Sequence, residues 1–120
     1  MKSNDEPRSL PHITLNHKEL LKGTTETIIL SALREQPMHG YYLRHWIRTH
    51  SNGALKCSPG MLYPLLHKLE KQKLIEAQWK RSKRGPRKKE YAITTQGHII
   101  LMENTAEWLK FVSLIHQLIA

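Results

Sequence analysis

Residues 74–94 read LIEAQWKRSKRGPRKKEYAIT and decide the fold of this 120-residue chain. The first seven residues and the last seven both alternate between apolar and polar side chains, which is typical of half-buried strands. The joining stretch, KRSKRGPRKK, holds seven cationic residues in ten around a Gly-Pro pair. Two short strands around a Gly-Pro loop predict a β-hairpin with a strongly basic tip.

The basic tip lies at the centre of an uneven charge distribution. The formal net charge is +9, and ten of the 19 Lys and Arg residues fall between positions 68 and 89, against two Glu. A run of like charges is usually a disordered tail or an address signal, but neither is flanked by alternating strands. Concentrated positive charge on a folded element indicates a polyanionic partner.

Composition excludes several other classes of protein. A single cysteine rules out an internal disulfide and fits a reducing compartment, and no secretory signal is visible, so we expect a soluble cytoplasmic protein. The eight histidines show no helical i, i+4 pairing and the ten acids are scattered singly. We therefore expect no metal site, no cofactor and no enzymatic activity.

Three helices are predicted before the hairpin and one after it. Residues 1–15 lack periodicity and are interpreted as a flexible tail. The first helix is expected to open near Asn16 and to stop at Gln36-Pro37, and the second to span about residues 40–50.

The second helix has two distinct faces. Leu43, Trp46 and Ile47 lie on its inner face, whereas Arg44 and Arg48, four residues apart, share the outer one. Such a basic pair is either an ordinary solvated surface or a contact to DNA phosphates, and the sequence leaves both interpretations open.

The third helix begins with a clear signal. Ser58 is a suitable N-cap and Pro59 suits the first helical position. Four leucines at i, i+3, i+4 and i+7 spacing commit one face to the core: Leu62, Leu65, Leu66 and Leu69. The side chains that remain point outward and are candidates for contacts with a partner.

The last helix, from about Thr95, is apolar on two sides. One seam consists of Leu101, Trp108, Val112, Ile115 and Ile119, and a second of Phe111, Leu114 and Leu118. Such a helix has more apolar surface than a three-helix core can cover, which predicts a partner chain, most simply a second copy.

Three helices, a two-stranded hairpin and a helix make a winged helix-turn-helix, a mainly α fold with a small antiparallel hairpin. The DNA-binding domain is expected over 16–94 and a C-terminal dimerisation helix over 95–120. The third helix would read double-stranded DNA while the wing neutralises phosphates. The candidate DNA contacts are Lys56, Ser58, Met61, Tyr63, Pro64, His67, Lys68, Lys83, Arg84, Arg87 and Lys88. The alternative is a basic adaptor for an anionic membrane surface or another acidic partner.

A family resemblance supports the first interpretation. In order along the chain, ELLKGTTETIILSAL, HGYYL (39–43), GMLYPLLHKLEKQKLI (60–75) and RGPRKKEYAITTQG (84–97) resemble successive blocks of the PadR family of bacterial transcriptional regulators. The resemblance covers roughly residues 18–110. The short stretch after Trp108 resembles the compact subfamily, which has a single C-terminal dimerisation helix.

The resemblance implies a homodimeric repressor that binds a pseudo-palindromic operator and is released by a small molecule. Tyr63 and residues 58–61 match the family's DNA-reading helix, and the wing match comprises Arg84, Gly85, Arg87 and Lys88. Trp108 matches a tryptophan that stacks on planar aromatic ligands between the subunits of some compact members. The extension before Asn16 departs from the shortest family pattern.

Each of these residues also has a simpler interpretation. Tyr63 and His67 contact base edges or cap the edge of the core, and Trp108 binds a ligand or only packs in the dimer. Cys57 is a redox-sensitive thiol at a helix N-terminus or, as we favour, a small spacer.

Overall fold

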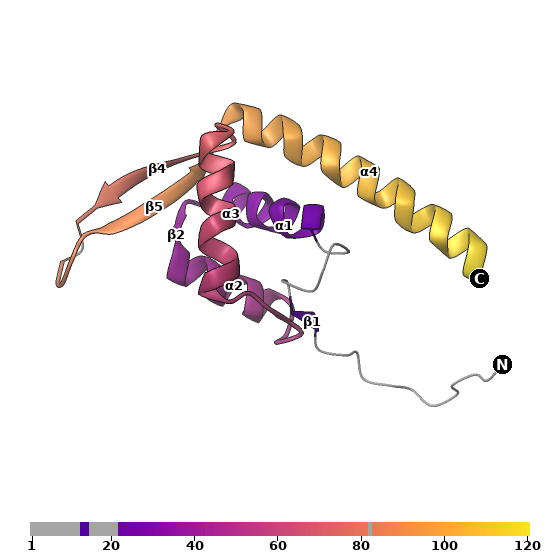
Figure 1. Ribbon diagram of the computed structural model, residues 1–120, viewed down its shortest axis with the longest axis horizontal. Helices are drawn as coiled ribbons and strands as arrows, with labels where there is room; N and C mark the ends of the chain where they lie inside the picture. Colours follow the sequence, from indigo (N-terminus) through magenta and orange to yellow (C-terminus); the bar gives the residue numbers. More distant parts are fainter. Residues whose placement is uncertain (1–12, 15–21, 82) are drawn as a thin grey trace.

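The computed structural model describes residues 13–14, 22–81 and 83–120 (Figure 1). Along the chain the elements are β1 (Ile13–Thr14), α1 (Lys22–Glu35), β2 (Met38–His39), α2 (Gly40–His50), β3 (Leu55–Lys56), α3 (Pro59–Lys71), β4 (Ile75–Lys80), β5 (Lys88–Ile93) and α4 (Thr95–Ile119). The predicted fold class, a mainly helical winged helix-turn-helix, is confirmed. In Figure 1 the β4–β5 wing and the free end of α4 extend to opposite sides of a body formed by α1, α2 and α3.

The start of α3 follows from its sequence. The Ser58 side-chain oxygen accepts a hydrogen bond from the Met61 backbone N–H at 3.2 Å, and Pro59 occupies the first turn, where a backbone donor is not needed. Leu62, Leu66 and Leu69 are fully buried, as their spacing predicts.

The core surrounds α1. Ile29, Leu30 and Leu33 of this helix meet leucines of α3 together with Leu43 and Ile47 of α2 in one cluster. Burial of this kind supplies most of the stability of a small helical domain.

The hairpin is present in the predicted place. β4 and β5 pair antiparallel from Ile75↔Ile93 to Lys80↔Lys88, and the alternation buries Ile75 and Tyr91. A third strand was not predicted: β2 pairs with the outer edge of β5 through Met38↔Tyr91 and His39↔Glu90, which gives the order β2-β5-β4.

Of residues 1–15, interpreted as a flexible tail, the structure describes Ile13 and Thr14. These two residues form β1, which pairs in parallel with Leu55 and Lys56 of β3. Residues 1–12 and the helix start predicted at Asn16 lie outside the described residues, in which α1 begins at Lys22.

The beginning of α4 is tied to the end of α3. The Thr94 hydroxyl lies 2.8 Å from the Lys73 carbonyl oxygen, and the Thr94 backbone N–H donates to the Leu74 carbonyl at 3.0 Å. Gly97 lies so close to the Leu74 carbonyl that a side chain there would collide with backbone. The exit angle of α4 is therefore fixed by the loop that follows α3.

Only the first turns of α4 pack on the body of the chain. Asn104 donates to the Thr27 hydroxyl of α1 at 3.3 Å, and Leu101 is 2% exposed. Every residue from Thr105 to Ala120 is exposed. Leu101 was predicted to belong to the dimer seam; the chain's own core buries it instead, so the exposed seam begins at Trp108.

Candidate nucleic-acid interface

The outward face of α3 presents the polar residues that the sequence predicted there. Pro64, His67 and Lys68 are exposed, and Tyr63 is 43% exposed. Met61 differs, because it is partly buried and packs against the core. The exposed surface of α3 thus centres on Tyr63, Pro64 and His67.

Tyr63 leans toward the start of α2. A methyl group built on Gly40 would lie 2.5 Å from the Tyr63 hydroxyl oxygen and 2.6–2.7 Å from ring carbons. The ring therefore rests directly on the glycine backbone. One side of the ring thus packs on α2 while the rest of the side chain faces solvent, and contact of Tyr63 with base edges stays a prediction.

Lys68 is oriented away from the centre of this face. Its ammonium forms a 2.7 Å ion pair with Glu26 of α1, although the lysine side chain is still 46% exposed. An exposed ion pair contributes little to stability, so it does not hold the side chain strongly. Lys68 therefore lies at the edge of the α3 surface.

The tip of the wing is exposed to solvent. Lys83, Arg84, Arg87 and Lys88 are exposed, and Figure 1 shows the loop projecting away from the helices. Among the described residues, no carboxylate lies within ion-pair distance of Lys83, Arg87 or Lys88. Uncompensated cations on a projecting loop are suited to neutralise phosphates.

Ion pairs occur at the base of the wing instead. Lys89 of β5 pairs with Glu70 of α3 at 3.3 Å, and its ammonium lies 5.5 Å from the centre of the Tyr91 ring. Burial raises the pKa of the Tyr91 hydroxyl, and the positive charge of Lys89 offsets part of that rise. These contacts link the base of the wing to α3, in addition to the burial of Ile75 and Tyr91 in the core.

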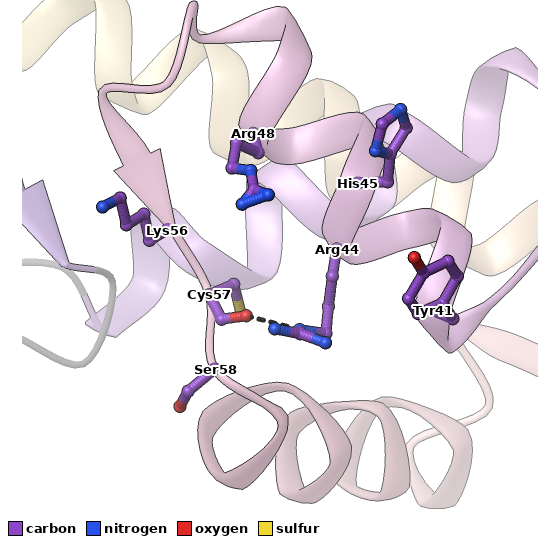
Figure 2. A pocket seen from close by; sticks show the side chains of 7 residues that line it. All are labelled: Tyr41, Arg44, His45, Arg48, Lys56, Cys57 and Ser58. Carbon is purple, nitrogen blue, oxygen red and sulfur yellow. Dashed lines mark hydrogen bonds between the residues drawn. The ribbon is translucent and has the colours of Figure 1, made fainter.

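Lys56 and Ser58 lie at the opposite end of α3, beside α2. They line a cleft of about 340 Å³ together with Tyr41, Arg44, His45, Arg48 and Cys57 (Figure 2). The sequence indicated that Arg44 and Arg48 share one helix face, but gave no signal that this face meets the segment before α3.

Cys57 is a structural residue in this arrangement. It is 5% exposed, and burial raises the pKa of its thiol while nearby Arg44 offsets part of that rise. A thiol with a raised pKa is a poor nucleophile, which favours the spacer interpretation over redox sensing.

Comparison with known proteins agrees with this geometry. Residues 29–103 match the model of the transcriptional regulator PadR-like family, which is more than half of the chain. The chain belongs to the PadR-like family. Regulators of this family bind DNA, typically as dimers, and are not enzymes.

Individual relatives are consistent with the assignment to the PadR-like family. The chain is 38% identical over 82 residues to the transcriptional regulator YqjI of Escherichia coli, a match that spans 68% of this chain and 38% of that protein. A transcriptional regulator from Clostridium thermocellum has a TM-score of 0.79 at 25% identity, covering 86% of this chain and all of the other. A PadR-like regulator from Bacillus cereus has a TM-score of 0.72 at 34% identity, covering 84% and 96%.

The described residues contain no group of three or more His, Cys, Asp or Glu placed to hold a metal ion. Within the same residues, no helix is long and apolar enough to cross a bilayer.

Proposed function

We propose that this PadR-like regulator is a homodimeric repressor that binds a pseudo-palindromic operator and is released by a small planar aromatic molecule. The observation that carries the proposal is the unpartnered apolar surface of α4. Beyond Thr105 the helix makes no buried contact with the described chain, yet it exposes eight large apolar side chains: Trp108, Leu109, Phe111, Val112, Leu114, Ile115, Leu118 and Ile119.

A second copy is the simplest cover for this surface. Soluble chains rarely expose contiguous apolar surface of this kind, and a twofold dimer covers the same patch on both subunits. Within the predicted seam, Val112 and Ile115 are the least exposed of the eight, at 37% and 36%. We therefore place the centre of the interface at these two residues.

DNA recognition is divided between two elements. Exposed side chains of α3, chiefly Tyr63 and His67, contact base edges in the major groove, and the wing contacts phosphates through Lys83, Arg84, Arg87 and Lys88. In a twofold dimer the two α3 helices enter successive major grooves on one side of the duplex.

Release by an effector is the part that rests most on the family resemblance. Trp108 is 47% exposed and lies at one end of the proposed dimer seam. A flat ring stacked on the two indoles between subunits would change the packing of the α4 helices, and through them the separation of the reading helices.

The deciding experiment selects bound sequences from a random pool of duplexes. We expect an inverted repeat with half-site centres about 10 base pairs apart. Tyr63→Ala and His67→Ala should each weaken binding to that repeat by roughly 1–3 kcal/mol, with little effect on unrelated duplexes. An enriched sequence without twofold symmetry would contradict the dimeric arrangement.

A parallel measurement tests the adaptor alternative. Binding to a mixed-sequence duplex and to vesicles containing anionic lipid is compared at equal salt. Because the wing is basic, both the duplex and the vesicle surface attract it. Only the duplex offers a major groove that the exposed face of α3 also contacts. Tighter binding to the vesicles than to any selected duplex would overturn the proposed function.

A further inference from the structure

The cleft between α2 and the start of α3 carries concentrated positive charge. Arg44 and Arg48 reach from successive turns of α2 toward the segment that leads into α3, and Lys56 lines the edge of the cleft (Figure 2). Within the described part of the chain, none of the three has a carboxylate within ion-pair distance. Such a grouping raises the electrostatic energy of the free protein and is relieved when an anion binds.

A hydrogen bond to the backbone orients the Arg44 guanidinium. Its Nε donates to the Cys57 carbonyl oxygen at 2.8 Å across the floor of the cleft, drawn as the dashed line in Figure 2. The Nη groups of its guanidinium make no hydrogen bond to any of the described residues, and they remain oriented by the Nε bond. A pre-oriented guanidinium loses little conformational entropy when it binds an oxyanion.

Ser58 contributes from the other side of the cleft. Its hydroxyl oxygen accepts the Met61 N–H as the cap of α3, which leaves the hydroxyl hydrogen available for an acceptor. The cleft thus presents two guanidinium groups, with the Lys56 ammonium and the Ser58 hydroxyl at its margin (Figure 2). This donor set matches the oxygens of a phosphate group.

We propose that this cleft is an anion subsite that holds one backbone phosphate of the bound DNA, with Arg48 and Arg44 as its principal contacts. The proposal rests on the proposed DNA-binding function and adds a third anchor to it, beside α3 and the wing. Because the cleft adjoins the first turn of α3, a phosphate held there fixes how deeply the N-terminal end of the reading helix enters the groove.

The subsite lies at the N-terminal end of α3, where α2 supplies its arginines. The base of the wing and the cleft lie at opposite ends of α3: Lys89 of β5 pairs with Glu70 near the C-terminal end, whereas Ser58 caps the N-terminal end. A phosphate held at the N-terminal end would therefore restrain α3 at the end that the base of the wing does not reach.

The test uses the full chain with Arg48→Gln, and Lys73→Gln as a matched control. Arg48 is exposed, and among the described residues its side chain makes no hydrogen bond to another side chain, so its loss should leave folding unchanged, which thermal melting verifies. Lys73 is also exposed and loses the same charge, but it follows the other end of α3. Affinity for a mixed-sequence duplex of about 25 base pairs, long enough for two helical turns, is measured across a range of salt concentrations.

We expect Arg48→Gln to weaken binding about fivefold at 0.15 M salt and to reduce the salt slope by about 0.9 in each subunit, because one phosphate contact is lost. Lys73→Gln should keep the slope of the unmodified protein. If the unmodified protein binds DNA and both variants match it, the subsite proposal is wrong while the proposed function stands. If the unmodified protein binds no duplex under any condition, the proposed function itself fails.

Calorimetry with inorganic phosphate in the absence of DNA distinguishes the source of the phosphate. Binding that is lost in Arg48→Gln, combined with unaltered duplex affinity, would identify a site for a free phosphorylated molecule and overturn the DNA assignment. Weak binding of inorganic phosphate, together with a reduced salt slope of DNA binding in Arg48→Gln, supports the assignment to a DNA phosphate.

Discussion

The contact between Tyr63 and Gly40 gives a sharp prediction about packing at the reading helix. In Gly40→Ala the new methyl group would lie 2.5–2.7 Å from the tyrosine ring, about 1 Å inside normal contact distance. The helix backbone is anchored by its packing, so the ring must move toward solvent. The resulting loss of folding stability cannot exceed what the buried contacts of the Tyr63 ring contribute.

The magnitude follows from the burial of Tyr63. The residue is 43% exposed, so a little over half of its roughly 200 Å² is buried, which at about 25 cal/mol per Å² corresponds to nearly 3 kcal/mol for complete removal. A displacement of about 1 Å loses only part of this, and alanine at the first position of α2 recovers less than the roughly 1 kcal/mol that separates it from glycine in a helix interior. We expect Gly40→Ala to destabilise the fold by about 1–2 kcal/mol.

A double-mutant cycle isolates the ring as the cause. Urea unfolding is measured for the unmodified protein, Gly40→Ala, Tyr63→Ala and the double variant, at one protein concentration because a dimer's stability depends on it. In the Tyr63→Ala background the Gly40 substitution should be neutral or slightly stabilising. An equal cost in both backgrounds would refute the reasoning, since the clash would then lie elsewhere.

Three other predictions concern the DNA and dimer surfaces. Arg84→Ala combined with Arg87→Ala should weaken selected and unrelated duplexes alike and lower the salt slope by about one unit per lost contact; a change in sequence preference at constant slope would show that the wing tip reads DNA. Val112→Glu combined with Ile115→Glu should give a folded monomer in sedimentation that binds DNA poorly, whereas a monomeric unmodified protein at micromolar concentration would contradict the dimer. Flat aromatic molecules should quench tryptophan fluorescence and weaken operator binding, and Trp108→Ala should remove both effects; an unaltered titration in that variant would leave Trp108 with a packing role only.

Much of this fold could be predicted from the sequence because neighbouring residues indicate where each major element begins and ends. Ser58 and Pro59 mark the start of α3, and the alternation on both sides of Gly85-Pro86 marks the wing. These patterns depend on neighbouring residues and on the free-energy cost of burying unpaired backbone groups. They therefore indicate the same element in almost any tertiary context.

The short strands could not be predicted in the same way. β1, β2 and β3 have two residues each, too few for an alternation to be recognised, and they exist because a distant strand offers its edge. Met38, for example, pairs with Tyr91 and is buried on the core side of that pairing.

Leu101 illustrates a different limit. It continues the spacing of Trp108 and Val112, and the pattern alone does not distinguish apolar residues covered by the chain's own core from those covered by a partner. The cleft is a third case: Arg44 and Lys56 are separated by a turn and a strand, and only the packing of α2 against the start of α3 brings them together.

The joint between α3 and α4 connects the two halves of the proposed mechanism. Thr94 uses its hydroxyl and backbone N–H to hold the carbonyls of Lys73 and Leu74, and the same hydroxyl oxygen accepts the Gly97 N–H at 3.0 Å. Since Gly97 also lies against the Leu74 carbonyl, the first turn of α4 has little freedom to pivot. A change in how two α4 helices cross would therefore be carried as a rigid rotation into α3, and not absorbed in a loose hinge. Because Ile75 and Tyr91 at the base of the wing are buried in the same core as the leucines of α3, the wing would turn with the reading helix. A ligand between the α4 helices would then alter the spacing of two complete DNA-binding surfaces.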